Sequence, residues 1–389
     1  MSVQPAEKTL KFNILKDDLS QFSEREPVFV TFGETMVRDT PADKQRAERT
    51  RQIDISMSGS EHILSVGLSR LGIPCRYITR VPDNPYGWML RNVTREQGVD
   101  AKFFSWAPKT DLMGRYILEL GRTPRRTAAW YQRKYSAASQ LGAGMIDWNA
   151  ALEHARLFHV SGITFGLAPH SGYQRNHCLE AFQEALAVKP ADCQVGMDFN
   201  YRGTLWDVEE CRGVMTPIIT GQVDWFITTI EDMANVFGMS CGSISADAIN
   251  KGNIGAISDA DLKQFARQVQ DKFKVPVVGI TVRYPDSFEA HRWESAALDA
   301  GGNFFRSPTI KPIVLWDRIG GGDTWNSGFY YGLLTETDSA RGVEKGVLVG
   351  DSITRLKQTL MFDLGIVTKA EVQALMEADV KGGGKRASR

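Results

Sequence analysis

The feature that most constrains the fold of this chain is the alternation of short apolar segments with longer amphipathic ones. Apolar runs typical of buried strands recur at residues 28–32, 76–79, 157–160, 195–199, 225–228 and 277–281. Segments with apolar residues at helical spacing lie between them, at residues 60–71, 86–97, 171–186, 208–219 and 259–273. This alternation predicts an α/β fold with a doubly wound, mostly parallel sheet and helices on both faces.

One region breaks the alternation. Residues 114–120 and 128–135 both predict strands, and no helix is expected between them. Together with residues 36–57 they would form a small antiparallel flap, so we expect a β lid made from about residues 36–57 and 112–137. Strands inserted into an α/β domain often cover a cleft. The alternative is an edge hairpin that only extends the main sheet.

The two ends of the chain differ from the α/β region, which we expect to span residues 28–378. Residues 1–27 are mixed and charged, and they predict an N-terminal extension with one helix. Residues 379–389 are rich in glycine and basic side chains and predict a disordered basic tail. The Gly-Lys pair in this tail does not indicate a phosphate loop, because no strand precedes it and no helix follows.

The composition excludes several classes of protein. Lysine plus arginine and aspartate plus glutamate number 46 each, and this balance argues against nucleic acid as a partner. The five cysteines form no C-x-x-C pair and no H-E-x-x-H occurs, so neither a disulfide framework nor a metal site of the protein itself is predicted. No signal peptide or membrane-spanning segment is visible. We therefore expect a soluble, cytoplasmic protein without a membrane partner.

The strongest chemical signal is the run Gly320, Gly321, Gly322 and Asp323. Three successive glycines leave their backbone N–H groups uncovered, and a helix that begins there directs its positive end to the same point. Such a site suits the charge on a phosphoryl group during transfer. Asp323 is placed to take a proton from an attacking hydroxyl. The alternative is a flexible glycine turn in which Asp323 only caps the helix.

The residues around this run extend the signal. From Asp317 to Gly328 the sequence is D-R-I-G-G-G-D-T-W-N-S-G, which resembles the second signature of the ribokinase (PfkB) family of carbohydrate kinases. The resemblance implies a ribokinase-like fold, with Asp323 as catalytic base and Gly320, Gly321 and Gly322 as the anion hole. Ile319 departs from the family, whose members usually carry threonine or serine there.

Residues 33–38 and 81–87 resemble the 2-keto-3-deoxygluconate kinases of this family, and residues 58–72 resemble the first signature of the family. The likeness implies a set of substrate-binding residues: Glu34, Gly59, Tyr116, Arg133, Asp198, Asn200 and Arg202, with Asp323. The two arginines would bind the carboxylate of an acid sugar through paired hydrogen bonds. Other roles stay open, since Arg133 lies on a hairpin with further arginines, Tyr116 suits sheet packing, and Asp198 and Asn200 can cap a turn.

The resemblance also implies ATP and Mg²⁺. Its ATP-binding residues would be Thr228, Thr281, Arg283, Gly320, Gly322 and Lys357, although Arg283 equally suits a surface charge. Mg²⁺ would enter with ATP and be held mostly by phosphates and water, with Glu231 as an outer-shell carboxylate.

The leading hypothesis is ATP-dependent phosphorylation of the terminal hydroxyl of 2-dehydro-3-deoxy-D-gluconate to the 6-phosphate. The alternatives are a kinase for 2-dehydro-3-deoxygalactonate, fructose or ribose, and a non-catalytic sugar-binding paralogue. Ile63 stands where the family usually has a sugar-binding Asn, which leaves the sugar open unless His62 takes that role. A nucleotide-binding oxidoreductase would need G-x-G-x-x-G after the first strand, and the chain lacks it there. The family likeness also implies a homodimer formed through the lid.

Overall fold

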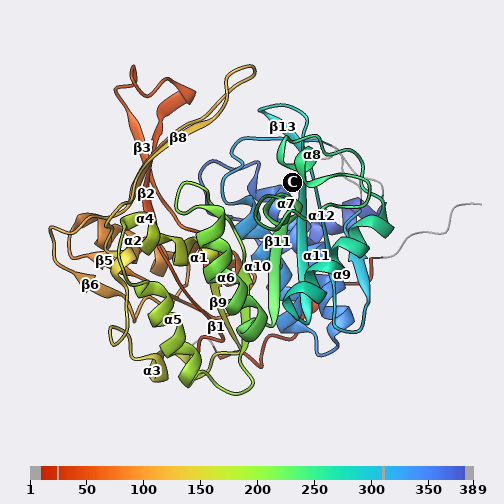
Figure 1. Ribbon diagram of the computed structural model, residues 1–389, viewed down its shortest axis with the longest axis horizontal. Helices are drawn as coiled ribbons and strands as arrows, with labels where there is room; N and C mark the ends of the chain where they lie inside the picture. Colours follow the sequence, from red (N-terminus) through yellow and green to blue (C-terminus); the bar gives the residue numbers. More distant parts are fainter. Residues whose placement is uncertain (1–9, 24–25, 309–311, 382–389) are drawn as a thin grey trace, which may run out of the picture.

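The computed structural model describes residues 10–23, 26–308 and 312–381. The strands of its main sheet are β1 (Phe29–Phe32), β4 (Cys75–Ile78), β9 (Leu157–Ser161), β10 (Gln194–Asp198), β11 (Trp225–Thr229), β12 (Val277–Pro285), β13 (Ala290–Leu298), β14 (Phe304–Arg306) and β15 (Ile313–Val314). Within the described residues their order is β14-β13-β12-β11-β10-β9-β1-β4, with β15 beside β13 (Figure 1). The strands from β12 to β4 pair in parallel, and β13 and β14 continue the sheet antiparallel. The predicted doubly wound, mostly parallel sheet is confirmed.

Helices cover both faces of this sheet, as predicted. One face carries α3 (Trp148–Leu152), α4 (Gly162–Ser171), α5 (His177–Val188), α6 (Val208–Gln222), α7 (Ile230–Phe237), α8 (Ala246–Asn250) and α9 (Asp259–Phe273). The other carries α1 (Ser60–Arg70), α2 (Pro85–Glu96), α10 (Gly321–Thr335), α11 (Ser339–Lys357) and α12 (Lys369–Lys381). Short 3-10 helices are η1 (Ile14–Lys16), η2 (Ala42–Lys44) and η3 (Ala138–Gln140).

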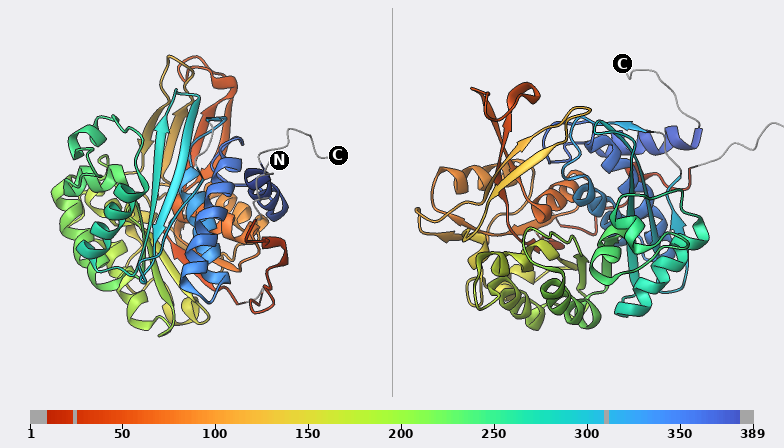
Figure 2. Two further views of the ribbon diagram at one scale, coloured as in Figure 1. Left: turned by 90° about the vertical axis from the view of Figure 1, so that its right-hand side faces the viewer. Right: turned by 45° about the horizontal axis from the view of Figure 1, so that its top comes forward.

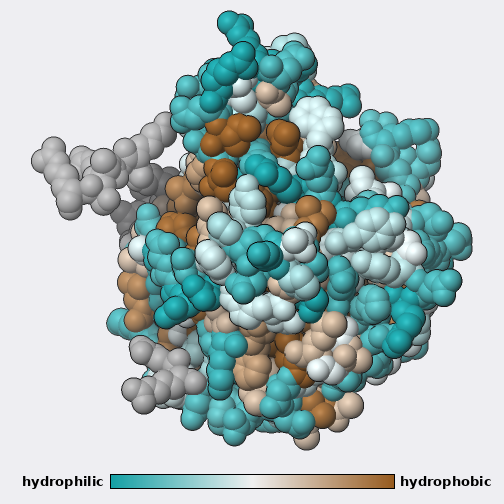
Figure 3. Space-filling view, turned by 90° about the vertical axis from the view of Figure 1, so that its left-hand side faces the viewer, coloured by the Kyte–Doolittle hydropathy of each residue, from teal (hydrophilic) through white to brown (hydrophobic). Residues whose placement is uncertain are grey.

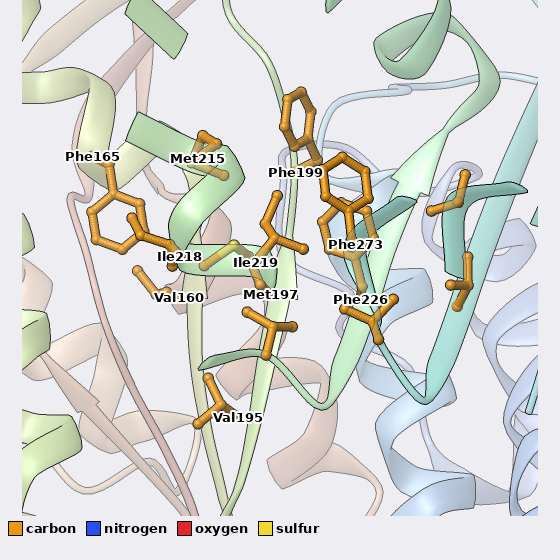
Figure 4. Packing of buried hydrophobic residues seen from close by; sticks show 14 of the residues in the cluster. Val160, Phe165, Val195, Met197, Phe199, Met215, Ile218, Ile219, Phe226 and Phe273 are labelled. Atoms are coloured by element: carbon orange, nitrogen blue, oxygen red, sulfur yellow. The ribbon is translucent and has the colours of Figure 1, made fainter. Parts of the chain in front are cut away.

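Strand periodicity divides the core in two. Val30 and Phe32 of β1 pack with α4, α5 and α6, whereas Phe29 of the same strand packs with α1 and α10. Figure 4 shows the first of these clusters, in which Val195 and Met197 of β10 meet the apolar side of α6. Because successive side chains of a strand point to opposite faces, an apolar strand buried on both sides needs two helical layers.

One helix boundary differs from the prediction. The helix predicted over residues 171–186 begins only at His177, as α5, and it is preceded by a helix that the sequence pattern did not predict, α4, which ends at Ser171. Gly172 ends α4 in the left-handed region at φ 72°, and Asn176 caps the start of α5. Glycine adopts this conformation at little cost, so the chain turns here instead of continuing as a single helix.

The lid is a separate four-stranded sheet that projects from the body (Figure 1). Its strands, in order, are β3 (Ile53–Ser58), β2 (Met36–Pro41), β7 (Arg115–Glu119) and β8 (Ala128–Gln132). The pairs β2–β3 and β7–β8 are antiparallel, but β2 and β7 are parallel. The prediction of an all-antiparallel flap is therefore wrong at its centre. Both β2 and β7 leave the body at the base of the lid, so they run in the same direction. A further parallel pair, β5 (Arg80–Pro82) with β6 (Ser105–Ala107), lies outside the lid.

The β12–β13 hairpin also rises toward the lid, as the left view of Figure 2 shows. Glu289 at its tip forms an ion pair with Arg122 of the lid at 3.2 Å. It also accepts a hydrogen bond from the Thr123 amide at 3.3 Å. The hairpin and the lid therefore meet above the carboxyl edge of the sheet.

Both ends of the chain belong to the packed structure over their described parts. Phe12, Ile14 and Phe22 are buried in the second core cluster, and this segment forms the 3-10 turn η1 instead of the predicted helix. The Ile14 amide donates to Gln373 of α12 at 2.9 Å. At the other end α12 continues to Lys381, and Asp379 pairs with Arg355 at 2.5 Å. Residues 379–381 of the predicted tail are thus helical, and residues 382–389 lie outside the described residues.

Two further expectations concern the whole chain. Of the helices that the structure describes, none is long and apolar enough to cross a membrane. All five cysteines are buried and free, as the absence of paired spacing predicts. Burial raises the pKa of the Cys193 thiol to about 12, so this thiol is not activated as a nucleophile.

Candidate active site

A cleft of about 420 Å³ opens where β10 and β11 end, alongside β12 and the first turn of α10. This volume lies in the range of small-molecule sites. The predicted residues that line the cleft are Asp198, Asn200, Arg202, Thr228, Glu231, Thr281, Arg283, Gly320, Gly321, Gly322 and Asp323. In open parallel sheets ligands bind at the carboxyl ends of the strands, which is where these residues come together.

The centre of the cleft is the start of α10. Gly320 caps the helix in the left-handed region at φ 78°, and Asp323 lies in the first turn. The amides of Gly321 and Thr324 donate to carbonyl groups of the preceding turn. Among the described residues, the amides of Gly322 and Asp323 have no acceptor. These two N–H groups lie at the positive end of the helix, so they suit an anion.

The three glycines differ in what surrounds them. A methyl group on Gly320 would come within 2.5 Å of the Asp363 carbonyl oxygen, and one on Gly321 would meet the Gln358 amide nitrogen at 3.0 Å. A methyl group on Gly322 would meet no atom within 4 Å. Gly320 is therefore required by the fold, whereas the open side of Gly322 faces the cleft.

Asp323 is a partly buried carboxylate that another helix holds in place. The Ser60 hydroxyl, at the start of α1, donates to Asp323 Oδ1 at 2.5 Å. Burial raises the pKa of Asp323, and the Ser60 hydrogen bond and the charge of Arg202 oppose this shift. A raised pKa makes the carboxylate a better general base, because the pKa of an efficient base lies near the working pH.

The end of β10 supplies the neighbours of Asp323. Asn326 donates to Asp198 Oδ2 at 2.8 Å, and Asn200 donates to the Ser60 hydroxyl at 3.4 Å. Burial, followed by the nearby charge of Asp323, raises the pKa of Asp198 to about 8. The Arg202 guanidinium lowers the pKa of both carboxyls, so it lies close enough to share their field.

Two of the predicted substrate residues, Arg133 and Glu34, form an ion pair with each other. Arg133 Nε donates to Glu34 Oε2 at 2.7 Å, and Ser136 donates to Glu34 Oε1 at 2.5 Å. Both members of the Arg133–Glu34 pair are buried, and neither lines the cleft. Gly59 also has a packing role, because a methyl group there would lie 2.3 Å from the Glu34 carbonyl oxygen.

The lid contributes an aromatic pair. Tyr116 is buried, donates to the Ser58 hydroxyl at 2.8 Å, and stacks on Tyr131 with ring centroids 5.1 Å apart. Tyr131 lines the cleft. The sequence analysis did not propose Tyr131 as a site residue. The register of β7 with β8 pairs it with Tyr116, so its position opposite Tyr116 in the predicted hairpin is the feature that could have identified it.

Lys357 does not line the cleft, although the sequence predicts an ATP contact. Its side chain is fully buried, and Nζ donates to the carbonyl oxygens of Asp317, at 3.0 Å, and of Ile319. Lys357 therefore holds the loop that leads into the glycines. Ile63 packs behind the same loop, where a methyl group on Gly320 would lie 3.2 Å from its Cδ1 atom. His62 is buried against Thr94 at 3.1 Å, away from the cleft.

A buried ion-pair cluster that the sequence did not suggest connects this loop to the lid. Arg38 of β2 donates to Asp317 Oδ2 and to Asp363 Oδ1, both at 2.5 Å. All three side chains are fully buried. One guanidinium thus fastens the base of the lid to the loop before the anion hole. Breaking such a pair leaves an uncompensated buried charge, which is strongly destabilising.

These features first define a class of protein. Open amides at a helix N-terminus, an adjacent carboxylate and a β lid over the carboxyl edge of a parallel sheet form the arrangement of a phosphoryl-transfer enzyme. The family follows from the sequence, because the model of the pfkB family carbohydrate kinases matches residues 29–262, more than half of the chain. The chain therefore belongs to the pfkB family of carbohydrate kinases.

Relatives and solved structures agree with this assignment. The 2-dehydro-3-deoxygalactonokinase of Haloferax volcanii is 26% identical over 354 residues, which cover 91% of this chain and 98% of the relative. The structure of 2-dehydro-3-deoxygluconokinase from Thermotoga maritima matches with a TM-score of 0.77 at 29% identity, over 90% of this chain and 98% of that one. An uncharacterized sugar kinase from Pyrococcus horikoshii in complex with ATP matches with a TM-score of 0.64 at 15% identity, over 89% and 99%. The fold is ribokinase-like, as predicted.

Proposed function

We propose that residues 28–378 transfer a phosphoryl group from ATP to the terminal hydroxyl of 2-dehydro-3-deoxy-D-gluconate, giving the 6-phosphate. The observation that carries this proposal is the Asp323 carboxylate beside the open amides of Gly322 and Asp323 in one cleft. A base and an anion site side by side provide the two functions that phosphoryl transfer needs, which are removal of the acceptor proton and stabilisation of the phosphoryl charge.

In the proposed reaction the acceptor hydroxyl lies against Asp323. The Ser60 hydrogen bond fixes one carboxylate oxygen. The other oxygen, which has no donor among the described residues, takes the proton as the acceptor oxygen attacks phosphorus. The glycine amides bind the transferring phosphoryl oxygens, and transfer is in line. Tyr131 and the lid cover the acceptor and limit the access of water.

ATP is the donor that we propose, since a related fold has been solved with ATP bound. Thr228, Thr281 and Arg283 lie along the cleft on the side of β11 and β12. Bound Mg²⁺ would neutralise charge on the phosphates. Burial raises the pKa of Glu231 in this cleft, so a nearby cation would favour its ionised form. Within the described ranges no group of three or more His, Cys, Asp or Glu is placed to cage a metal, which leaves the phosphates as the main ligands.

Arg202 supports an acid as the acceptor. It is exposed and lines the cleft, and in the described part of the chain no carboxylate lies within 4 Å of it. Arg133, by contrast, already has a carboxylate partner in Glu34. Arg202 is thus the predicted acid-binding arginine that is free to bind a substrate carboxylate.

The test of this proposal is a panel assay of ADP release with ATP, Mg²⁺, 2-keto-3-deoxy acids, fructose and ribose. We expect turnover with the acids, and Arg202→Gln should raise their KM by about 10- to 100-fold, as expected for losing a charged hydrogen bond. Arg95→Gln on α2, which removes an exposed arginine outside the cleft, is the matched control. Turnover with neutral sugars alone would refute the assignment of an acid as the acceptor. Absence of turnover with every sugar in the panel would favour a non-catalytic paralogue.

A second candidate acceptor is 2-dehydro-3-deoxygalactonate, which the Haloferax relative favours. The two acids differ in configuration at one hydroxyl-bearing carbon. Ile63 makes no polar contact that would distinguish them, because it packs behind the glycine loop. The ratio of kcat/KM for the two acids in the same panel decides between them.

We further propose that the lid forms a homodimer. Ile53, Ile55 and Trp130 are exposed on one face of the lid sheet, where the strand register places Ile55, the buried Asp39, Ile117 and Trp130 in one row. Figure 3 shows hydrophobic side chains gathered below the polar tip of the lid. An apolar face of this kind marks a protein contact.

The dimer is tested by analytical ultracentrifugation. The unmodified chain should sediment at twice its mass of 43.3 kDa. Trp130→Asp should give monomers, because a charge in the centre of an apolar contact is costly to bury. Trp88→Asp, which changes an exposed tryptophan of α2 outside the lid, should leave the dimer intact. A monomeric unmodified chain would exclude this interface.

A further inference from the structure

The β12–β13 hairpin presents a basic face to the cleft. Side chains alternate across a strand, so Thr281 and Arg283 of β12 point to one side, and Trp293 and His291 of β13 join them. The opposite side, with Tyr284, Arg292 and Glu294, lines a different cavity. The hairpin therefore forms one wall of the cleft with a defined set of inward residues.

Two guanidinium groups converge on this part of the cleft. Arg283 comes from the hairpin and Arg318 from the loop before the glycines, and both are exposed cleft-lining residues. In the described part of the chain neither has a carboxylate within 4 Å, unlike Arg38, Arg115 and Arg133. Desolvation by the walls of the cleft, and then the neighbouring charge of Arg283, lowers the pKa of Arg318, so the two cations repel one another. An anion between them would relieve this repulsion.

The neighbouring groups show that this is a separate end of the cleft. The charge of Arg283 lowers the pKa of Glu231 and of His291, whereas the charges of Arg202 and Lys357 lower that of Asp323. Arg318 and Arg283 both act on His291 of β13, whereas Asp323 is held by Ser60 at the start of α1. In an in-line transfer the acceptor and the leaving group lie on opposite sides of the phosphorus. The arginine end is thus the leaving-group end.

We propose that Arg283 and Arg318 together bind the non-transferred phosphates of the donor and stabilise the charge on the leaving diphosphate. The bond between the γ-phosphorus and the bridging oxygen breaks, and a bond to the acceptor oxygen forms. The acceptor proton goes to Asp323, and the bond electrons remain on the β-phosphate, beside the two guanidinium groups. Planar guanidinium groups suit phosphate oxygens through paired hydrogen bonds. This inference rests on the proposed function only for the nature of the donor.

The experiment measures nucleotide binding by calorimetry without any acceptor, using ADP, AMP and inorganic tripolyphosphate. We expect Arg283→Gln and Arg318→Gln each to weaken ADP and tripolyphosphate binding by about 10- to 100-fold while AMP binding changes little. Arg292→Gln removes an arginine from the other side of the same hairpin and should match the unmodified chain.

Several outcomes would refute the proposal that Arg283 and Arg318 bind the donor phosphates. These are an unchanged ratio of ADP to AMP affinity in both variants, an equal loss in Arg292→Gln, and an unmodified chain that binds neither ADP nor tripolyphosphate. A rise in acceptor KM with unchanged ADP binding would assign Arg318 to the acid instead. Because no turnover is needed, arginine-dependent ADP binding in a chain that phosphorylates no sugar acid would refute the proposed substrate and retain the pair.

Discussion

Replacing Asp323 by asparagine should lower kcat by about 100- to 10,000-fold, the range that a general base contributes, and leave nucleotide binding nearly unchanged. Asparagine has the same shape and keeps an oxygen that can accept the Ser60 hydrogen bond. It cannot take a proton at neutral pH. Steady-state kinetics of ADP release, with calorimetry of ADP binding, would separate the chemical step from binding.

The pH dependence gives this prediction a second readout. Burial raises the pKa of Asp323, and the carboxyl must be ionised to accept a proton, so activity should fall as pH decreases through this raised pKa. The acid limb should therefore lie above the ordinary aspartate range and should be absent from the residual activity of Asp323→Asn. Asp259→Asn, which changes an exposed carboxylate outside the cleft, is the control for charge alone. Full activity in Asp323→Asn would refute the assignment of the base.

Much of the fold was predictable because its signals are local. Apolar strands such as β10 and amphipathic helices such as α9 carry their periodicity within one segment, and strand–helix alternation then favours a parallel sheet. The α4–α5 break and the parallel β2–β7 pair were missed for different reasons. The first depends on the conformation of one glycine, and the second on where two distant strands leave the body.

The site was predictable where it is contiguous. Gly320 to Asp323 form one turn, and Asp198 to Arg202 follow one strand, so each group stays together in the fold. What the sequence did not reveal are the pairings between distant segments. Arg133 meets Glu34 across 99 residues, and Arg38 meets Asp317 across 279 residues. A sequence shows that these groups are charged, but not which charges neutralise one another.

Lys357 shows the same limit from the other direction. From its sequence position alone, Lys357 could bind a nucleotide phosphate. In the structure it is buried beneath the glycine loop and donates to backbone carbonyls. Arg318, next to that loop, is exposed and has no ion-pair partner among the described residues. Burial, which local sequence does not reveal, decides which cation holds the protein and which is available to a ligand.

The second large effect is expected in the glycine run, because its members differ in what an added methyl group would meet. At Gly322 a methyl group would meet nothing within 4 Å and would enter the space where the anion is proposed to bind. Gly321 is one residue away in the same turn, and its methyl group would meet the side-chain ends of Gln358, at 3.0 Å, and of Thr354, at 3.4 Å. The two alanine variants therefore test occupation of the anion site while keeping the helix, the loop and the net charge the same.

Gly322→Ala should lower kcat by about 100- to 1000-fold, the cost of losing one donor to a transferring group. Gly321→Ala should keep most of the activity, and both variants should unfold at nearly the temperature of the unmodified chain. Gly320→Ala should instead lose stability by about 1–2 kcal/mol or more, because alanine is strained in the left-handed region. There, at φ 78°, its methyl group would also press on the Asp363 carbonyl. Steady-state kinetics and thermal unfolding on the three variants check these results. Equal activity in Gly322→Ala and Gly321→Ala would show that the open side of Gly322 is not where the phosphoryl group binds.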